Sequence, residues 1–253
     1  MDFEYMTYKD DNMKFNAKIG DTVTFLGDKN ESIINNLMFL NENNFLTIDN
    51  YEITKKNIDK LRQNIGFASI DQMDTFVSET VMDELAFNLE SEAIKTNEMK
   101  SKIKEISEKF KLDKYLEKSP SSLDNSSKAK LSIARVVISS PKVLVIDNIL
   151  KELDKDDKEV VIKFLKEFCI NSIILNFTTE IEETLLGKRL IITDKDKILI
   201  EGETLSVLNE EKIMKRLGYN LPFIVLLNKY LKDYELIDRY YLDYELLGGA
   251  LWK

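Results

Sequence analysis

The sequence predicts an α/β protein built on a mostly parallel β-sheet with helices on both faces. Short apolar runs of strand length alternate along the chain with longer segments of helical periodicity. Such alternation is typical of parallel sheets, because the crossover helices cover both faces. The 253 residues, of which 43% are hydrophobic and 32% charged, are those of a folded protein with one main domain and room for a small appendage.

The N-terminal quarter is expected to contain mainly strands. Residues 14–18 alternate in polarity, and residues 21–27 (DTVTFLG) form an apolar run that ends in glycine, which is the pattern of a buried strand. A helix over residues 31–40 should follow directly. Residues 44–49 are predicted to return as a strand.

The middle of the chain is predicted to be mainly helical. A polar helix over residues 55–64 leads into a strand over residues 65–70, and residues 78–110 are helical and densely charged. Pro120, in the sequence SPSS, should end this region because proline lacks a donor and biases its neighbour away from the helix.

The C-terminal half repeats the alternation of helices and strands. Asp124 or Asn125 can cap a helix that runs to residue 140. The elements that follow are a strand at 142–147, a helix at 155–168, a strand at 172–177, a short helix, and a strand at 189–193. Everything after about residue 204 is predicted to be helical.

The composition excludes several classes of function. The sequence has no histidine, which excludes histidine-based acid–base catalysis and histidine metal sites, and we expect no metal site. Cys169 is the single cysteine, so no intrachain disulfide can form. The net charge of −9 is unfavourable for binding nucleic acid. Without a signal-peptide pattern or a membrane-length apolar run, a soluble, cytoplasmic protein is expected.

Two segments have the frame of a nucleotide-binding fold. A buried strand that ends in Gly27 and continues into a helix is the frame of a P-loop. Further along, Pro141 precedes an apolar strand that ends in Asp147, which is the frame of a Walker B strand. With these frames in this order, the chain resembles the ATPase subunits of ABC transporters, and specifically those of the energy-coupling factor (ECF) type.

The resemblance covers nearly the whole chain. The similar segments are 132–154, around the Walker B strand, 76–90, and the tail motifs Leu217-Gly218, Leu221-Pro222-Phe223 and Ala250-Leu251-Trp252. It implies a P-loop NTPase-like ABC nucleotide-binding domain over residues 1–203, with an N-terminal antiparallel β-subdomain and a helical subdomain at about 71–140. Residues 204–253 would form a small C-terminal helical extension that serves in dimerisation.

The P-loop position departs from the motif G-x-x-x-x-G-K-[ST]. Ile33 stands where the phosphate-binding lysine is expected, and Ile34 stands where the Mg²⁺-binding hydroxyl is expected. Asp28 and Glu31 place carboxylates at the start of the helix, where each stabilises the helix by roughly 0.3–1 kcal/mol but repels a nucleotide. A pair of like unit charges about 6 Å apart costs about 3 kcal/mol at an effective dielectric constant of about 20.

The other catalytic positions of the family are altered too. The Q-loop glutamine corresponds to Ile70, and the LSGGQ signature corresponds to residues 123–127 (LDNSS). The general-base glutamate corresponds to Asn148, whose amide cannot take a proton from water, and the switch histidine corresponds to Thr179. We therefore predict no catalytic residue.

Three residues are candidates for a vestigial nucleotide site. The resemblance implies Tyr8 as the aromatic that stacks on adenine, together with Gly27 and Asp147. Tyr8 has an alternative role as a half-buried strand tyrosine, and Asp147 can simply end its strand. No cofactor is expected, and ATP with Mg²⁺ is the alternative.

Other family segments imply binding to partners. Glu79, Asp83 and Glu84 would offer carboxylates to arginines of a transmembrane scaffold subunit, or form a solvated acidic helix face. Phe223 and Leu227 would contact a paralogous ECF ATPase subunit or a second copy of the chain, or pack within their own domain.

The sequence thus predicts a pseudo-ATPase that docks to transporter partners at the inner face of the membrane without hydrolysing ATP. One alternative is a slow ATPase subunit that borrows missing groups from its partner and energises uptake of a vitamin or metal ion. A second is a soluble binding protein with no role in a transporter.

Overall fold

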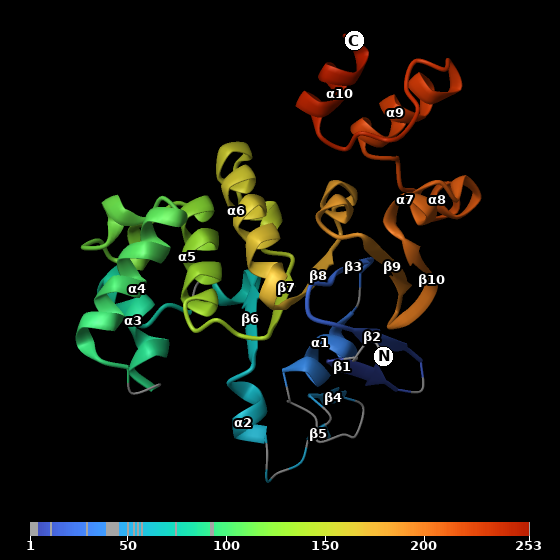
Figure 1. Cartoon of the computed structure of the whole chain (residues 1–253). Coiled ribbons are helices and arrows are strands. Elements are labelled where there is room, and N and C mark those ends of the chain that lie inside the picture. Colours follow the sequence, from blue (N-terminus) through green and yellow to red (C-terminus); the bar gives the residue numbers. More distant parts are fainter. Residues whose placement is uncertain are drawn as a thin grey trace.

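The computed structural model describes residues 5–252 except 11, 29, 39–45, 50, 53, 55, 57, 74, 92 and 93, and it leaves out the side chains of 60 and 91. Two sheets form the α/β framework, and helices surround the larger one (Figure 1). Within the described residues, no helix is both long enough and apolar enough to cross a membrane.

The larger sheet has six strands in the order β10-β9-β3-β8-β7-β6. Its strands are β3 (Thr22–Leu26), β6 (Ile65–Ser69), β7 (Val143–Asp147), β8 (Ile173–Thr178), β9 (Arg189–Asp194) and β10 (Lys197–Glu203). All neighbouring pairs are parallel except β9 with β10. The predicted mostly parallel sheet is confirmed, because the central strands are apolar runs buried on both faces.

The sequence analysis missed β10. This strand alternates between exposed and half-buried residues and pairs antiparallel with β9 at the edge of the sheet. The connecting turn consists of Lys195 and Asp196, both with positive φ (51° and 58°), which is the left-handed conformation that tight two-residue hairpins require.

The smaller sheet is antiparallel, with the order β2-β1-β4-β5. Its strands are β1 (Met6–Lys9), β2 (Lys14–Ala17), β4 (Leu46–Ile48) and β5 (Tyr51–Glu52). The predicted N-terminal antiparallel subdomain is therefore confirmed. Phe15 of β2 contacts Phe25 of the larger sheet edge to face, with ring centroids 5.0 Å apart, so the two sheets share one core.

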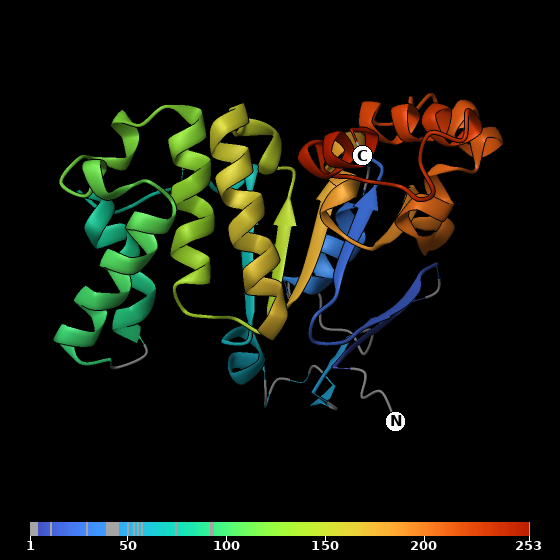
Figure 2. The same ribbon diagram turned by 45° about the horizontal axis from the view of Figure 1, so that its top comes forward.

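Helices cover both faces of the larger sheet. The helices of the main body are α1 (Glu31–Leu37), α2 (Ile58–Arg62), α3 (Val81–Ser91), α4 (Thr96–Lys109), α5 (Asn125–Val137) and α6 (Lys155–Phe168). One face lies under α5 and α6, and the other faces α1 and the antiparallel sheet (Figure 2). Asp124 and Asp154 cap α5 and α6, each accepting a hydrogen bond from the backbone N–H three residues later.

Several predicted boundaries differ from the structure. The helical region 78–110 is divided into α3 and α4, α1 ends at Leu37, and α2 is shorter than the predicted 55–64. Short 3₁₀ turns connect the elements at Ile70–Gln72, Asp113–Tyr115, Pro120–Ser122, Leu150–Glu152, Cys169–Asn171 and Ile181–Leu186. Part of the predicted strand at 44–49 and of the helix at 31–40 lies outside the described residues.

The C-terminal residues are helical, as predicted, after β10 ends. They form α7 (Thr204–Leu208), α8 (Glu211–Leu217), α9 (Phe223–Asp233) and α10 (Tyr244–Leu251). Ile224 and Val225 of α9 belong to a buried cluster with Leu26, Leu190 and Ile192 of the larger sheet. This cluster holds the extension beside the β9 and β10 edge (Figures 1 and 2).

Candidate functional site

A pocket of about 320 Å³ lies where β3, β7 and β8 end. It is lined by Gly27, Asp28, Asn30, Glu31, Ile34, Ile70, Asp71, Asp147, Asn148, Lys151, Phe177 and Thr179. Parallel strands bring their carboxyl ends to one edge of the sheet, which explains why segments far apart in the sequence meet here. The pocket thus brings together the residues that stand at the P-loop, Q-loop, Walker B and switch positions.

The pocket is predominantly acidic. Asp28, Glu31, Asp71 and Asp147 contribute four carboxylates, and Lys151 contributes a cation. Burial raises the pKa of Asp147, and the negative charge of Asp71 raises it further, against a hydrogen bond from the side-chain amide of Asn148 at 2.9 Å. A polyanion that entered this pocket would be repelled by these carboxylates.

The first turn of α1 hydrogen-bonds to a carboxylate that the sequence analysis did not identify. The backbone N–H groups of Ser32 and Ile33 donate to Oδ1 of Asp196, with N···O distances of 3.2 and 3.5 Å. Asp196 belongs to the β9–β10 turn. The contact therefore joins this hairpin to the start of α1, and Ile33 and Asp196 are 163 residues apart in the sequence. Burial raises the pKa of Asp196, the two amides lower it, and the charges of Asp10 and Glu31 raise it again.

Gly27 is required by packing against the neighbouring strand. Its φ is +152°, and a Cβ at this position would lie 2.4 Å from the carbonyl oxygen of Thr193 in β9. No larger side chain fits without a shift of backbone, so the presence of glycine here follows from the contact of β3 with β9.

Tyr8 lies inside the core. Its relative exposure is 0%, its ring is stacked on Phe15, and its hydroxyl donates to Oδ2 of Asp10 at 2.7 Å. The amide of Asn36 donates to the same hydroxyl at 2.8 Å, and burial raises the pKa of Tyr8. The ring has no free face on which an adenine could stack, so the structure contradicts the predicted stacking role. The alternative prediction was a half-buried strand tyrosine, whereas Tyr8 is fully buried.

Polar groups at the start of α5, at the signature position, form hydrogen bonds and an ion pair with other groups of the protein. Asp124 accepts a hydrogen bond from the backbone N–H of Ser127 at 2.7 Å, and this contact lowers its pKa. Ser126 donates to Oδ2 of Asp157 at 2.8 Å, and the buried Lys130 pairs with the same carboxylate at 2.8 Å. Polar groups at this helix end are therefore held by side chains of the protein.

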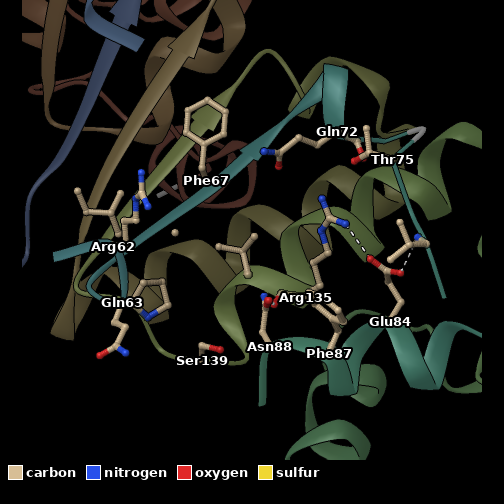
Figure 3. A pocket seen from close by; sticks show the side chains of 15 residues that line it. Arg62, Gln63, Phe67, Gln72, Thr75, Glu84, Phe87, Asn88, Arg135 and Ser139 are labelled. Carbon is tan, nitrogen blue, oxygen red and sulfur yellow. Dashed lines mark hydrogen bonds and ion pairs between the residues drawn. The ribbon is translucent and has the colours of Figure 1, made fainter. Parts of the chain in front are cut away.

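A larger groove of about 600 Å³ lies between β6, α3 and α5 (Figure 3). We call it the docking groove. Its lining residues are Arg62, Gln63, Ile65, Gly66, Phe67, Gln72, Thr75, Val77, Glu84, Phe87, Asn88, Arg135, Val136, Ser139 and Pro141. Two of its apolar side chains are freely accessible, since Val77 is 77% and Phe87 59% exposed.

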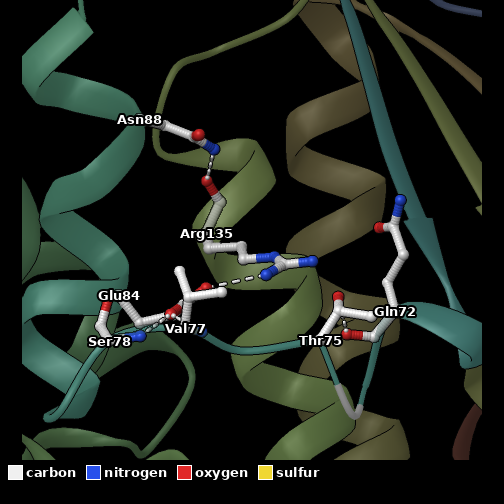
Figure 4. Close-up of polar contacts among 7 residues, drawn as sticks. All are labelled: Gln72, Thr75, Val77, Ser78, Glu84, Asn88 and Arg135. Carbon is white, nitrogen blue, oxygen red and sulfur yellow. Dashed lines mark hydrogen bonds and ion pairs between the residues drawn. The ribbon is translucent and has the colours of Figure 1, made fainter.

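Glu84 is not available to a partner, and the predicted role is corrected accordingly. Its side chain is 3% exposed, and its Oε1 accepts a hydrogen bond of 2.8 Å from Nη1 of Arg135 (Figure 4). Its Oε2 accepts from the backbone N–H groups of Val77 and Ser78 at 3.2 and 3.1 Å. Arg135 also lies 5.0 Å from the ring centroid of Phe76. The buried carboxylate is thus neutralised by an arginine 51 residues away in the sequence.

The two other predicted carboxylates remain at the surface. Glu79 and Asp83 are both exposed, and neither lines the docking groove. Thr80 donates to Oδ2 of Asp83 at 2.6 Å, and the backbone N–H of Asp83 donates to the hydroxyl of Thr80 at 3.1 Å. These bonds fix the start of α3 beside the groove.

Many apolar side chains of the C-terminal residues are exposed. Phe223 is 65% exposed, whereas Leu227 is half-buried and packs on the cluster that joins α9 to the sheet. The further exposed side chains are those of Tyr230, Tyr234, Leu236, Leu242, Tyr244, Leu246, Leu251 and Trp252. Exposed apolar side chains mark sites of protein–protein interaction where they gather into one patch. We call these side chains together the α9–α10 surface.

Comparisons with known proteins point in one direction. The ABC transporter family model matches residues 31–151. The ECF transporter ATP-binding protein EcfA1 of Mycoplasma mobile is 28% identical over 74% of this chain and 69% of its own length. EcfA1 of Ligilactobacillus salivarius is 24% identical over 90% of this chain and 87% of its own.

Solved structures agree on the fold. The cbiO1 protein of Clostridium perfringens, part of an ABC transporter complex, has a TM-score of 0.74 at 20% identity and covers 88% of this chain and 98% of its own. A dimeric ATP-binding cassette in a post-hydrolysis state, bound to ADP and phosphate, has a TM-score of 0.68 at 20% identity over 78% of this chain and 95% of its own.

Proposed function

Because this chain is a homologue of the ATP-binding subunits of energy-coupling factor transporters, we propose that it acts as a pseudo-ATPase. It binds a transmembrane scaffold subunit and a second ATP-binding subunit, and it does not hydrolyse ATP. The second subunit is a paralogue or another copy of this chain. Such a complex would hold the protein at the inner face of the membrane.

The acidic pocket at the ends of β3, β7 and β8 carries the proposal. Its described lining places four carboxylates around the expected position of the phosphates. The positions of the motif lysine, the Mg²⁺-binding hydroxyl and the general base are taken by Ile33, Ile34 and Asn148. Asp196 adds a fifth carboxylate at the first turn of α1. Each unit-charge pair about 6 Å apart opposes binding of a triphosphate by about 3 kcal/mol at an effective dielectric constant of about 20.

Two surfaces support the docking part of the proposal. The docking groove presents the accessible side chains of Val77 and Phe87, and the α9–α10 surface presents Phe223 with its aromatic and aliphatic neighbours. The first would receive the scaffold and the second would pair with the other subunit. Neither surface depends on the altered catalytic positions.

Co-purification tests the docking. The tagged chain is co-expressed with the scaffold and ATP-binding subunits encoded in the same genome and recovered from detergent-solubilised membranes. Phe87→Asp should lose the scaffold, whereas Lys104→Glu, a charge change on an exposed residue of α4 outside the groove, should keep it. Recovery of no partner by the unmodified chain would refute the proposal.

Calorimetry and a phosphate-release assay with Mg-ATP test whether the chain binds and hydrolyses nucleotide. The unmodified chain should give no binding heat at millimolar nucleotide, and no phosphate release above that of a buffer blank. Hydrolysis that disappears in Asp147→Asn would instead establish the slow ATPase.

A further inference from the structure

Three buried side chains carry polar atoms that have no hydrogen-bond partner in the described part of the chain. They are Thr24 of β3, Asn176 of β8 and Glu183 of the turn Ile181–Leu186, and they are 0%, 0% and 3% exposed. The unpaired atoms are Oγ1 of Thr24, both Nδ2 and Oδ1 of Asn176, and Oε2 of Glu183. Because an unpaired polar atom in a protein interior is costly, each of these atoms needs an explanation.

Thr24 and Asn176 lie side by side on one face of the larger sheet. They are register partners in the parallel pair of β3 and β8. Side chains alternate along a strand, so Asn176 shares a face with Ile174. Ile174 belongs to the core cluster that contains residues of α5 and α6, whereas Leu175 and Phe177 belong to the cluster on the other face. The two unpaired side chains therefore lie on the face that α5 and α6 cover.

The turn Ile181–Leu186 runs back along β3 on the chain's way to the next strand. Thr178, the last residue of β8, is the register partner of Leu26 at the end of β3. After the turn, a Cβ on Gly187 would lie 2.4 Å from the carbonyl oxygen of Thr22, at the start of the same strand. The middle of the turn therefore lies beside the middle of β3, which is the position of its unpaired threonine.

Glu183 occupies the middle of this turn, and its side chain reaches α6. Its Oε1 accepts a hydrogen bond of 2.7 Å from Nζ of Lys158 in α6. Side chains three residues apart share a face of a 3₁₀ helix. Leu186, three residues after Glu183, packs on the cluster that contains Ile174. The second carboxylate oxygen thus lies between α6 and the sheet face that carries the other unpaired atoms.

We propose that Thr24, Asn176 and Glu183 hold a buried water molecule between β3, β8 and this turn. Water suits the set, because one molecule can accept a hydrogen bond from the Asn176 amide and donate to the carboxylate and to the hydroxyl oxygen. A bare cation suits it less well. It would be repelled by the N–H groups of the amide, and Lys158 already neutralises the carboxylate.

The water supports a segment that connects two parts of the molecule. Thr179, just before the turn, lines the acidic pocket. Ile181 and Leu185 of the turn pack on the buried cluster that holds the C-terminal extension. The site is independent of docking and of ATP hydrolysis, because its side chains line neither the docking groove nor the acidic pocket.

A crystal structure of the unmodified chain that shows ordered waters tests the site directly. A water should lie within hydrogen-bond distance of the Asn176 amide and of either the Glu183 carboxylate or the Thr24 hydroxyl. Direct hydrogen bonds among these three side chains, with no water between them, would overturn the inference. So would an Asn176 amide without any partner.

Magnetic relaxation dispersion of water tests the site in solution, because it detects internal waters that exchange slowly. The double variant Thr24→Val with Asn176→Leu replaces polar atoms by apolar groups of similar shape, and it should lose a long-lived water. Thr204→Val is the control, since the buried hydroxyl of Thr204 already donates to the carbonyl oxygen of Gly187 at 2.7 Å. An unchanged signal in a folded double variant would contradict the proposal. If circular dichroism shows that this variant does not fold, the crystal structure of the unmodified chain decides.

Discussion

The carboxylate of Asp196 lies 3.2 Å from the backbone nitrogen of Ser32, at the first turn of the helix that follows β3. The contact places an anion of the protein itself at the helix start where the sequence predicts the frame of a P-loop. Because a helix start favours negative charge, this carboxylate stabilises α1 and competes with any other anion.

The Asp196 contact can be followed by the amide resonances of α1. In the unmodified chain the Ser32 and Ile33 amide shifts should change with pH through a midpoint above the ordinary aspartate pKa, since burial raises the pKa of Asp196. This pH response should disappear in Asp196→Asn. Asp194→Asn, an exposed residue of the same hairpin, should leave it intact. Identical titration curves for all three proteins would contradict the contact.

Asp147→Asn is expected to stabilise the protein near neutral pH. A raised pKa means that the native state binds more protons than the unfolded state between the ordinary and the raised value. Stability therefore falls as the pH rises through that interval, and the asparagine variant avoids the loss. Urea unfolding should show a gain above the raised pKa and none below the ordinary aspartate pKa. A gain that persists at low pH would point to another cause.

Breaking the buried pair between Glu84 and Arg135 should be strongly destabilising. Glu84→Ala removes the carboxylate that pairs with Arg135, whose side chain is only 16% exposed. The expected loss in the free energy of unfolding is about 3–5 kcal/mol. Glu90→Gln, an exposed residue of the same helix, should stay within about 0.5 kcal/mol. Chemical denaturation measures both variants, and equal losses would show that the pair is not the cause.

Gly27→Ala should destabilise the fold for a reason unrelated to nucleotide. The new Cβ would clash with the carbonyl oxygen of Thr193, and strain of this kind costs about 1–3 kcal/mol. Gly249→Ala is the control, because no atom lies within 4 Å of a Cβ there and alanine favours the helix by about 0.5–1 kcal/mol. In thermal unfolding, Gly27→Ala should lower the melting temperature and Gly249→Ala should raise it.

Phe223→Asp tests the α9–α10 surface. Sedimentation velocity of the chain, alone and with a candidate ATP-binding subunit, should show weaker pairing for this variant, because a charge replaces a side chain that is 65% exposed. Unchanged sedimentation alongside an intact fold by circular dichroism would assign the surface to some other role.

The sheet was predictable because its central strands are apolar runs with clear ends. The pattern from residue 142 to 147 reads as a buried strand and forms one. The sequence KILIEGE of β10 has only three consecutive apolar residues, flanked by Lys197 and Glu201, so it lacks the longer apolar run of a buried strand, and only its pairing with β9 reveals it. Edge strands of this kind depend on tertiary contacts more than on composition.

The site was less predictable, because its main contacts join distant residues. Nothing next to Glu84 in the sequence indicates that Arg135 neutralises it, and nothing near Ile33 indicates Asp196. The grouping of Gly27, Ile70 and Asp147 could be predicted from strand order and family resemblance. The burial of Tyr8 required knowledge of how the antiparallel sheet packs on β3.

The hairpin between β9 and β10 has only two residues at its tip, both in the left-handed conformation. Insertion of a single residue there would leave the strands free to pair but would carry the side chain of Asp196 away from the amides it faces. The length of this turn is thus constrained by α1, which is 163 residues away in the sequence, and a change in loop size would alter the charge at the start of that helix.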